Sequence, residues 1–273
     1  MNFRALLTAA AVAVVPTLLT AQPPGSEQAA ARLESSPRHG ELVDIQLPGG
    51  QAALKTWVVY PERKDRAPAV IVIHEIYGLT DWLRGVADQL AADGFIALAP
   101  DLLSGKGPGG GGTESFASRD EVVQQIRGLD AAEVHAKLDA VRAYAIALPA
   151  ASGKSATIGF CWGGSASFAY AAAQPELDAA VVYYGSAPEA DKLAAIQAPV
   201  LGLYGGDDAR VTSTVEPTDQ EMQRLGKSYK HEIYEGAGHG FLRDQSGRDG
   251  ANAKAAEQAW PRTLKFLRQH TGG

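Results

Sequence analysis

The sequence contains one cysteine, Cys161, among its 273 residues. A lone cysteine excludes an internal disulfide framework, and it lacks the cysteine companions of a thiolate metal site. No long basic run occurs, and the formal net charge of −6 argues against binding to nucleic acid. The chain after residue 40 also lacks an apolar run long enough to cross a bilayer. What remains, with 45% hydrophobic and 21% charged residues, is the composition of one large globular domain.

The N-terminus has the pattern of an export signal. Residues 1–21 carry one early arginine, then an apolar stretch, then small residues, which predicts a secretory signal peptide cleaved near Ala21. A membrane anchor is the alternative, but Pro16 and the shortness of the apolar run weaken it. Residues 22–40 are rich in Pro, Ser, Gly and Ala without apolar periodicity, which predicts a flexible lead-in. We therefore expect a periplasmic or secreted protein with no stable membrane span once the signal is removed.

From residue 41 to 273 the pattern predicts a single α/β domain. Residues 41–47 and 52–60 alternate in polarity around a Pro-Gly-Gly turn, as in an antiparallel hairpin at a sheet edge. Apolar strands then alternate with helices, which predicts a mostly parallel, doubly wound sheet with helices on both faces. The predicted strands are 68–75, 95–102, 156–160, 179–184, 199–204 and 229–235, and the predicted helices are 79–94, 115–147 with a break near Gly128, 164–173, 216–226 and 251–269.

Catalytic groups in such sheets gather outside the carboxyl ends of the strands. Cys161 lies at such an end, in IGFCWGGS (158–165), between a predicted strand and a predicted helix. Glycines on both sides of one residue at a strand-to-helix corner are typical of the nucleophile position in α/β-hydrolases, where a serine usually stands. The amides at the start of a helix would favour the thiolate. The alternative, a small buried hydrophobic residue, is the commoner role of a lone cysteine, but the glycine bracket favours a nucleophile.

A nucleophile needs a base, and the base needs a carboxylate to orient it. Asp207 and Asp208 follow the apolar strand of PVLGLYGGDDARV, and His239 lies in a glycine-rich loop after the next strand. The chain order is therefore nucleophile, acid, histidine, as in α/β-hydrolases. The alternatives are helix capping by one of the aspartates and a surface position for the histidine.

Glu75 follows the fully apolar strand of IVIHEIYG, where an unpaired carboxylate would be costly to desolvate. It is a candidate catalytic group, and the alternative is a buried ion pair with an arginine such as Arg243. In serine hydrolases the loop after this strand supplies an oxyanion-hole amide. The backbone N–H groups of Ile76 and Trp162 are therefore the predicted oxyanion hole. No phosphate-binding, dinucleotide or zinc motif is complete, so we expect no cofactor and no metal.

Together these segments resemble the dienelactone hydrolase family, the carboxymethylenebutenolidases. The resemblance covers about Glu41 to Gln269 and depends on HEIYG, APDLL, GFCWGG, GGDDARV and GHGFLR, in that order. It implies an α/β-hydrolase fold over residues 41–273 and a Cys161–His239–Asp208 triad. The family pattern G-G-x-D-x-x-V selects Asp208 over its neighbour. The resemblance also implies that Glu75 helps to deprotonate the resting thiol when substrate arrives.

The implied reaction is hydrolysis of a carboxylic ester or lactone of a small molecule, and we expect a monomer. Family members acting on dienelactone hold its carboxylate with two arginines. Arg243 matches the second of them, but the first is missing, and Lys106 stands near its place within SGKGPGGGG. Lysine lacks the planar fork of arginine, so it is not an equivalent replacement, and the resemblance implies the fold and the nucleophile more strongly than the substrate. A general esterase or thioesterase of the same fold, and a non-catalytic binder of a small ligand, are the alternatives.

Overall fold

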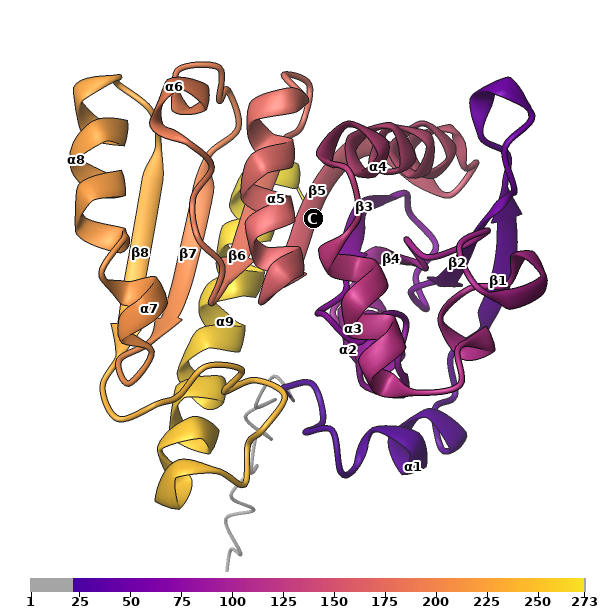
Figure 1. Ribbon diagram of the computed structural model, residues 1–273, viewed down its shortest axis with the longest axis horizontal. Helices are drawn as coiled ribbons and strands as arrows, with labels where there is room; N and C mark the ends of the chain where they lie inside the picture. Colours follow the sequence, from indigo (N-terminus) through magenta and orange to yellow (C-terminus); the bar gives the residue numbers. More distant parts are fainter. Residues whose placement is uncertain (1–21, 273) are drawn as a thin grey trace, which may run out of the picture.

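The computed structural model describes residues 22–272, so the predicted signal peptide, residues 1–21, lies outside the described residues. The described chain forms an eight-stranded sheet in the order β1-β2-β4-β3-β5-β6-β7-β8 (Figure 1). β1 and β2 pair antiparallel at one edge, and β3 to β8 run parallel to one another. The strands are β1 (Gly40–Ile45), β2 (Leu54–Val59), β3 (Ala67–Ile73), β4 (Ile96–Pro100), β5 (Ala151–Phe160), β6 (Ala179–Tyr183), β7 (Val200–Gly205) and β8 (Tyr229–Tyr234).

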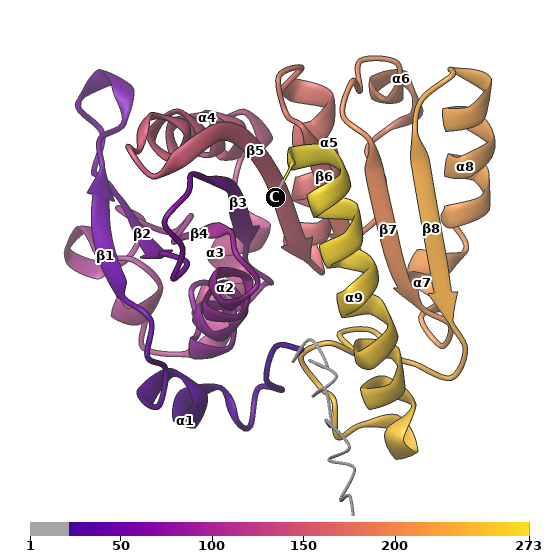
Figure 2. The same cartoon turned by 180° about the vertical axis from the view of Figure 1, so that it is seen from behind.

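Helices cover both faces of the sheet, and each face has its own apolar core. α4, α5 and α8 lie on the face turned to the viewer in Figure 1, and α2 and α9 cover the face seen in Figure 2. The central parallel strands are buried on both faces, which explains why they are continuous apolar runs in the sequence. The helices are α1 (Ala29–Glu34), α2 (Asp81–Ala92), α3 (Arg119–Arg127), α4 (Ala131–Ala147), α5 (Trp162–Ala173), α6 (Ala190–Leu193), α7 (Ala209–Thr212), α8 (Val215–Arg224) and α9 (Ala251–Thr271).

The predicted fold class is confirmed, including the edge hairpin and the helix break. Gly128 caps α3, and Asp130 then begins α4 by accepting hydrogen bonds from two backbone N–H groups of its first turn. The sequence did not indicate α1, α6 or α7, each of which has only four to six residues. Helices this short bury too few side chains to produce a readable apolar period.

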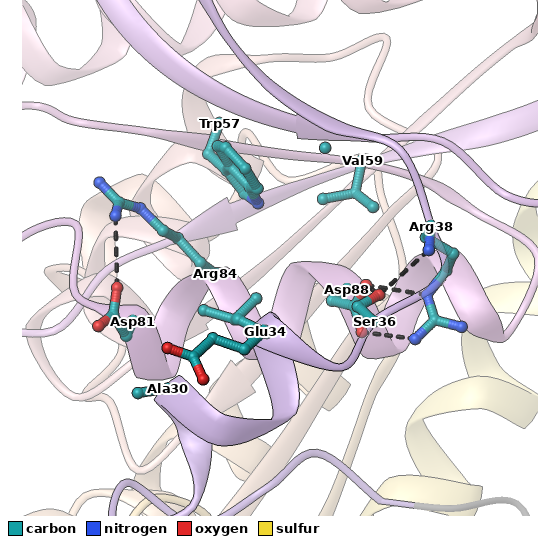
Figure 3. Close-up of a pocket in the computed structure, with 11 residues that line it drawn as sticks. Ala30, Glu34, Ser36, Arg38, Trp57, Val59, Asp81, Arg84 and Asp88 are labelled. Atoms are coloured by element: carbon teal, nitrogen blue, oxygen red, sulfur yellow. Dashed lines mark hydrogen bonds and ion pairs between the residues drawn. The ribbon is translucent and has the colours of Figure 1, made fainter.

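The segment predicted to be a flexible lead-in, residues 22–40, carries α1 and packs against α2. The indole N–H of Trp82 donates to the carbonyl of Pro24 at 3.1 Å, and Ala29 is buried. Further along, the Arg38 guanidinium pairs with the carboxylate of Asp88 through two N–H groups (Figure 3). These contacts join small or polar residues to side chains some 50 positions away, so apolar periodicity could not reveal them.

A cavity of about 450 Å³ lies between α1, β2 and α2, with Trp57, Glu34 and Arg84 among the side chains around it (Figure 3). It belongs to the same region as the Arg38–Asp88 pair, which lies at its edge.

Within residues 22–272, no helix combines the length and the apolar character that a membrane crossing requires.

Candidate active site

The carboxyl ends of β3, β5, β7 and β8 lie along the same end of the sheet. In Figure 1 this end is marked by the arrowheads of β7 and β8 and by the start of α5. A cavity of about 500 Å³ opens there. With one exception, every residue that the sequence analysis proposed for the site lines this cavity: Cys161, His239, Glu75, Ile76, Trp162 and Arg243. The exception is Asp208, which contacts His239.

Cys161 occupies the corner between β5 and α5 in a strained conformation. Its φ of 56° and ψ of −116° lie outside the regions that L-residues ordinarily adopt. The corner is tight because an added Cβ at Gly159 would meet the carbonyl oxygen of Gly163 at 1.9 Å. The Cys161 N–H donates to the carbonyl of Tyr183 at 3.0 Å, which ties the corner to β6. Strain of this kind persists where the surrounding structure imposes it, and it is common at active sites.

The surroundings of Cys161 keep its thiol protonated at neutral pH. Burial raises the pKa of the Cys161 thiol, and the negative charge of Glu75 raises it further. A hydrogen bond from the Trp162 backbone N–H and the charge of Arg210 act in the opposite direction and are smaller. In residues 22–272 the structure shows no hydrogen bond between the Cys161 sulfur and His239. Cys161 is therefore present as a thiol, which is a weaker nucleophile than a thiolate.

His239 and Asp208 form a close pair at the ends of neighbouring strands. His239 Nδ1 lies 2.5 Å from Asp208 Oδ2, and the Asp208 side chain is buried. A bond at Nδ1 leaves Nε2 available on the side of the cavity that His239 lines. Asp207 is turned away, and its half-exposed carboxylate pairs with Arg248 at the surface. His239 therefore pairs with Asp208, the aspartate that the family pattern selects, and not with Asp207.

Glu75 makes the buried ion pair that was considered as its alternative role. Its Oε2 lies 2.8 Å from Nε of Arg243, and its side chain is 5% exposed. Burial raises the pKa of Glu75 to about 7, although the charge of Arg243 lowers it. Because Glu75 also lines the cavity with Cys161, the ion pair does not remove it from the site. It places a carboxylate that titrates near neutral pH beside the thiol.

His74 shapes the loop that carries Glu75 and Ile76. It is fully buried, its Nδ1 donates to the carbonyl of Glu75 at 2.7 Å, and its Nε2 accepts from the Leu102 N–H at 3.3 Å. Its ring also stacks on Trp162 with centroids 5.6 Å apart, which joins the two loops that supply the predicted oxyanion hole. Within residues 22–272 the Ile76 N–H makes no hydrogen bond.

The sequence analysis missed several residues around the cavity. Arg127, the last residue of α3, and Arg210, in α7, line it, and so does Tyr184, whose ring meets that of His239 edge-on at 5.2 Å. Arg210 lies two positions after Asp208, so a signal for it was present in the motif. Lys106, which stood near the place of the missing arginine, pairs with Glu133 at 2.7 Å and does not line this cavity.

A different arginine approaches the Glu75–Arg243 pair. The guanidinium carbon of Arg119, the first residue of α3, lies 3.6 Å from the ring centre of Tyr77, and that of Arg243 lies 5.4 Å from the same ring. Stacking on an aromatic face is a favourable arrangement for a guanidinium.

In residues 22–272 no group of three or more His, Cys, Asp or Glu side chains is arranged to hold a metal ion.

Comparison with known proteins identifies the family of this chain. A sequence model of the dienelactone hydrolase family matches residues 54–271. A protein of Salmonella typhimurium LT2 with the provisional name carboxymethylenebutenolidase is 31% identical over 242 residues, covering 83% of this chain and 86% of its own. A protein of Escherichia coli K12 with the same provisional name is 33% identical over 220 residues, covering 75% of this chain and 78% of its own.

Among solved structures, a protein of Klebsiella pneumoniae described provisionally as a dienelactone hydrolase superposes with a TM-score of 0.74. It is 28% identical and covers 85% of this chain and 99% of its own. The match to the family model spans β2 to α9, and so contains each of the strand ends that form the cavity. With this fold and this degree of similarity, the chain belongs to the dienelactone hydrolase family and is a hydrolase.

Proposed function

We propose that the protein hydrolyses a carboxylic ester or lactone bond of a small molecule, with Cys161 as nucleophile. The observation that carries this proposal is the joint placement of three groups on one cavity. A cysteine at a strained strand-to-helix corner, a histidine bonded to a buried aspartate, and a carboxylate with a pKa of about 7 all meet there. A protein that only binds a ligand has no need of this combination.

In the first half of the reaction, Glu75 takes the proton of the Cys161 thiol, and the sulfur attacks the carbonyl carbon. The oxyanion that forms accepts hydrogen bonds from the Ile76 and Trp162 backbone N–H groups. Loss of one such donor typically costs about 2.7–4 kcal/mol of transition-state stabilisation. The C–O bond then breaks, the proton passes from Glu75 to the departing oxygen, and a thioester on Cys161 remains.

In the second half, His239 Nε2 takes a proton from water, and the resulting hydroxide attacks the thioester carbonyl. Asp208 stabilises the imidazolium through the bond to Nδ1. The C–S bond breaks, the acid product leaves, and the proton on His239 returns to the sulfur. The proton on the resting thiol also protects it, because oxidation requires thiolate character and access. Such protection suits the periplasmic or extracellular location that we propose from the pattern of residues 1–21.

Alkylation of the protein tests this proposal, because Cys161 is the only cysteine in the chain. Iodoacetamide at alkaline pH is expected to add one carbamidomethyl group per chain, and ester hydrolysis should fall in proportion to the labelled fraction measured by mass spectrometry. Excess ester substrate should slow the labelling. Cys161→Ala is the control, and it should be unlabelled and inactive. Full activity in the alkylated protein would rule out the cysteine mechanism. If the parent protein hydrolysed no ester at all, the alternative of a non-catalytic protein that binds a small ligand would be favoured.

Replacing Glu75 by glutamine should change the reactivity of the thiol and the hydrolysis rate in opposite directions. Because the charge of Glu75 raises the pKa of Cys161, its removal should shift the pH profile of alkylation to lower pH. Hydrolysis at pH 8 should fall by about 10²–10⁴-fold, the usual contribution of a general base. In the parent protein, hydrolysis should rise with pH through about 7, as Glu75 loses its proton and can act as a base. A parallel change of both rates would show that Glu75 does not act as the base.

A further inference from the structure

The segment that precedes α1, residues 22–28, lies between two parts of the active site, and we call it the strap. It contains no helix or strand, yet Pro23, Pro24 and Gly25 are buried. In Figures 1 and 2 the start of the described chain, in indigo, lies beside the loop that leads into α9. The match to the dienelactone hydrolase model begins at residue 54, so the strap lies outside that match.

One side of the strap is bonded to the loop between β8 and α9. The N–H of Ser26 donates to the backbone carbonyl of Arg243 at 2.9 Å. The side-chain amide of Gln245 donates to the carbonyl of Pro23 at 2.9 Å. Because the guanidinium of Arg243 is the partner of Glu75, the strap is bonded directly to the backbone of the residue that pairs with Glu75.

The other side of the strap packs on α2, which begins shortly after Glu75. The indole N–H of Trp82 donates to the carbonyl of Pro24 at 3.1 Å. The ring of Pro24 lies over Gly85, where an added Cβ would be 3.2 Å from Pro24 Cγ. Trp82 and Gly85 are both buried, so water does not compete for these contacts. The strap thus joins the chain segment that carries Glu75 to the loop that carries Arg243.

The Glu75–Arg243 pair depends on where the backbone of Arg243 lies. The Glu75 side chain is 5% exposed, and a buried carboxylate that loses its partner is strongly unfavourable. The Arg243 side chain is long and 27% exposed, and holding it in one conformation costs rotamer entropy. Its Nε lies 2.8 Å from the carboxylate, so a shift of the loop away from the cavity would lengthen this contact.

We propose that the strap is a positioning element of the active site, which holds the loop of Arg243 against α2 and so keeps the Arg243 guanidinium on Glu75. This deepens the proposed function and rests on it, because Glu75 is the proposed base for the thiol. The strap acts through Arg243, and Gln245 is the side chain that binds the loop to it.

Loss of this contact should give a base that titrates at higher pH. Burial raises the pKa of Glu75 to about 7, and the charges of Arg243, on the loop after β8, and Arg119, in α3, lower it. Cys161 and Tyr184 also lie near Glu75, but burial raises the pKa of both, so neither is charged at neutral pH. If the loop moves away, Arg119 is the positive charge that remains, and the pKa of Glu75 rises.

Two variants weaken the strap from its two sides. Gln245→Ala removes the side-chain bond to Pro23 at a partly exposed position, where the fold should tolerate it. Gly85→Leu places a larger side chain under Pro24, and leucine favours a helix more than glycine does, so α2 itself is not weakened. If Gly85→Leu does not fold, Gln245→Ala alone decides.

Arg38→Gln is the control, because it loosens the lead-in segment far from the loop. Within the described residues, the hydrogen bonds that Arg38 donates go to Asp88 and Ser36, and none reaches the loop of Arg243. In each folded protein the titration of Glu75 is followed through its carboxyl ¹³C chemical shift, with Glu75→Gln to assign the signal. No substrate is present, so this measurement does not depend on the reaction.

The midpoint of the Glu75 titration should lie at higher pH in Gln245→Ala and Gly85→Leu than in the parent. With phenyl acetate, kcat/KM of these two variants should be about three- to tenfold below that of the parent at about pH 6 and close to it at about pH 9, where Glu75 is deprotonated in every protein. Arg38→Gln should melt at a lower temperature than the parent but keep the parent's titration and pH profile.

Two results would overturn the proposal. One is an unchanged Glu75 titration in the folded strap variants. The other is an equal shift in Arg38→Gln, which would mean that any loosening of the lead-in segment has the same effect. Neither result affects the proposed function, which hydrolysis and its loss in Cys161→Ala test separately. A shifted titration in a protein that hydrolyses no ester would support the strap and contradict the proposed function.

Discussion

The Asp208→Asn variant is expected to lose about 10⁴-fold in kcat for ester hydrolysis, the size of effect observed when a histidine base loses its orienting carboxylate. Asp208 Oδ2 lies 2.5 Å from Nδ1 of His239, so the carboxylate fixes the proton on Nδ1 and leaves Nε2 free to accept one. An asparagine can present its NH₂ group to Nδ1, which would favour the tautomer with the proton on Nε2. That tautomer cannot take a proton from water.

Asp207→Asn is the matched control, because it makes the same chemical change one residue away. Asp207 is half exposed and pairs with Arg248, and surface pairs of this kind contribute about 0–1 kcal/mol to stability. Its kcat and melting temperature should therefore stay close to those of the parent. Steady-state kinetics on one uncharged aryl ester measure both variants, with circular dichroism to show that each is folded. If Asp207→Asn lost the activity and Asp208→Asn kept it, the assignment of the triad acid would be wrong.

The fold was readable from the sequence because its strands are buried on both faces. β3, β6 and β7 are continuous apolar runs between helices with clear caps, and parallel topology follows from that alternation. The same logic placed Cys161 and His239 at one sheet edge, since each comes soon after the end of a strand. The position just beyond a strand is a local feature of the chain, so a single sequence carries the signal.

The contacts that the sequence could not predict join distant segments through side chains. Glu75 and Arg243 are far apart in the chain, and their pairing was only one of two interpretations. Arg127 ends a helix whose position over the cavity depends on how α3 packs, which no periodicity encodes. The choice between Asp207 and Asp208 came from the family pattern, because both follow β7 at almost the same place. The helices and strands could be identified from the sequence, but the directions in which their side chains point could not.

The ion pair of Glu75 connects the charge of the cavity to the protonation state of the Cys161 thiol. A carboxylate held beside Arg243 and the thiol keeps the sulfur protonated, and it can accept that proton only when its own charge is present. The positive charge of Arg210 acts in the opposite direction and favours the thiolate. The site thus combines a protonated thiol with a neighbouring carboxylate whose pKa of about 7 lets it accept a proton near neutral pH.

Gly163→Ala is expected to destabilise the protein by about 3 kcal/mol or more, the upper end for an overpacked site, although helix propensity alone predicts a gain. Gly163 is the second residue of α5. In a helix interior, alanine is favoured over glycine by about 1 kcal/mol. An added Cβ, however, would meet the carbonyl oxygens of His74 and Ile73 at 2.3 and 2.4 Å. These are backbone atoms at the end of β3, so no side-chain rotation relieves the overlap, and α5 must move away from the sheet.

The clash is the larger effect, because overlaps with fixed backbone belong to the class of substitutions with the largest losses of stability. For a domain of this size, the melting temperature should fall by about 6 °C or more, at about 2–4 °C per kcal/mol. Gly128→Ala is the control, since its added Cβ would lie 3.5 Å from the nearest atom, the carbonyl oxygen of Gln125, at ordinary contact distance. Gly128→Ala should lose about 1 kcal/mol of stability or less, so its melting temperature should stay within a few degrees of that of the parent. Because Gly163 packs on the loop that carries Glu75 and Ile76, any folded Gly163→Ala protein should also lose hydrolysis. Equal melting temperatures for the two variants would show that the corner can accommodate a Cβ at Gly163 and that the predicted clash is wrong.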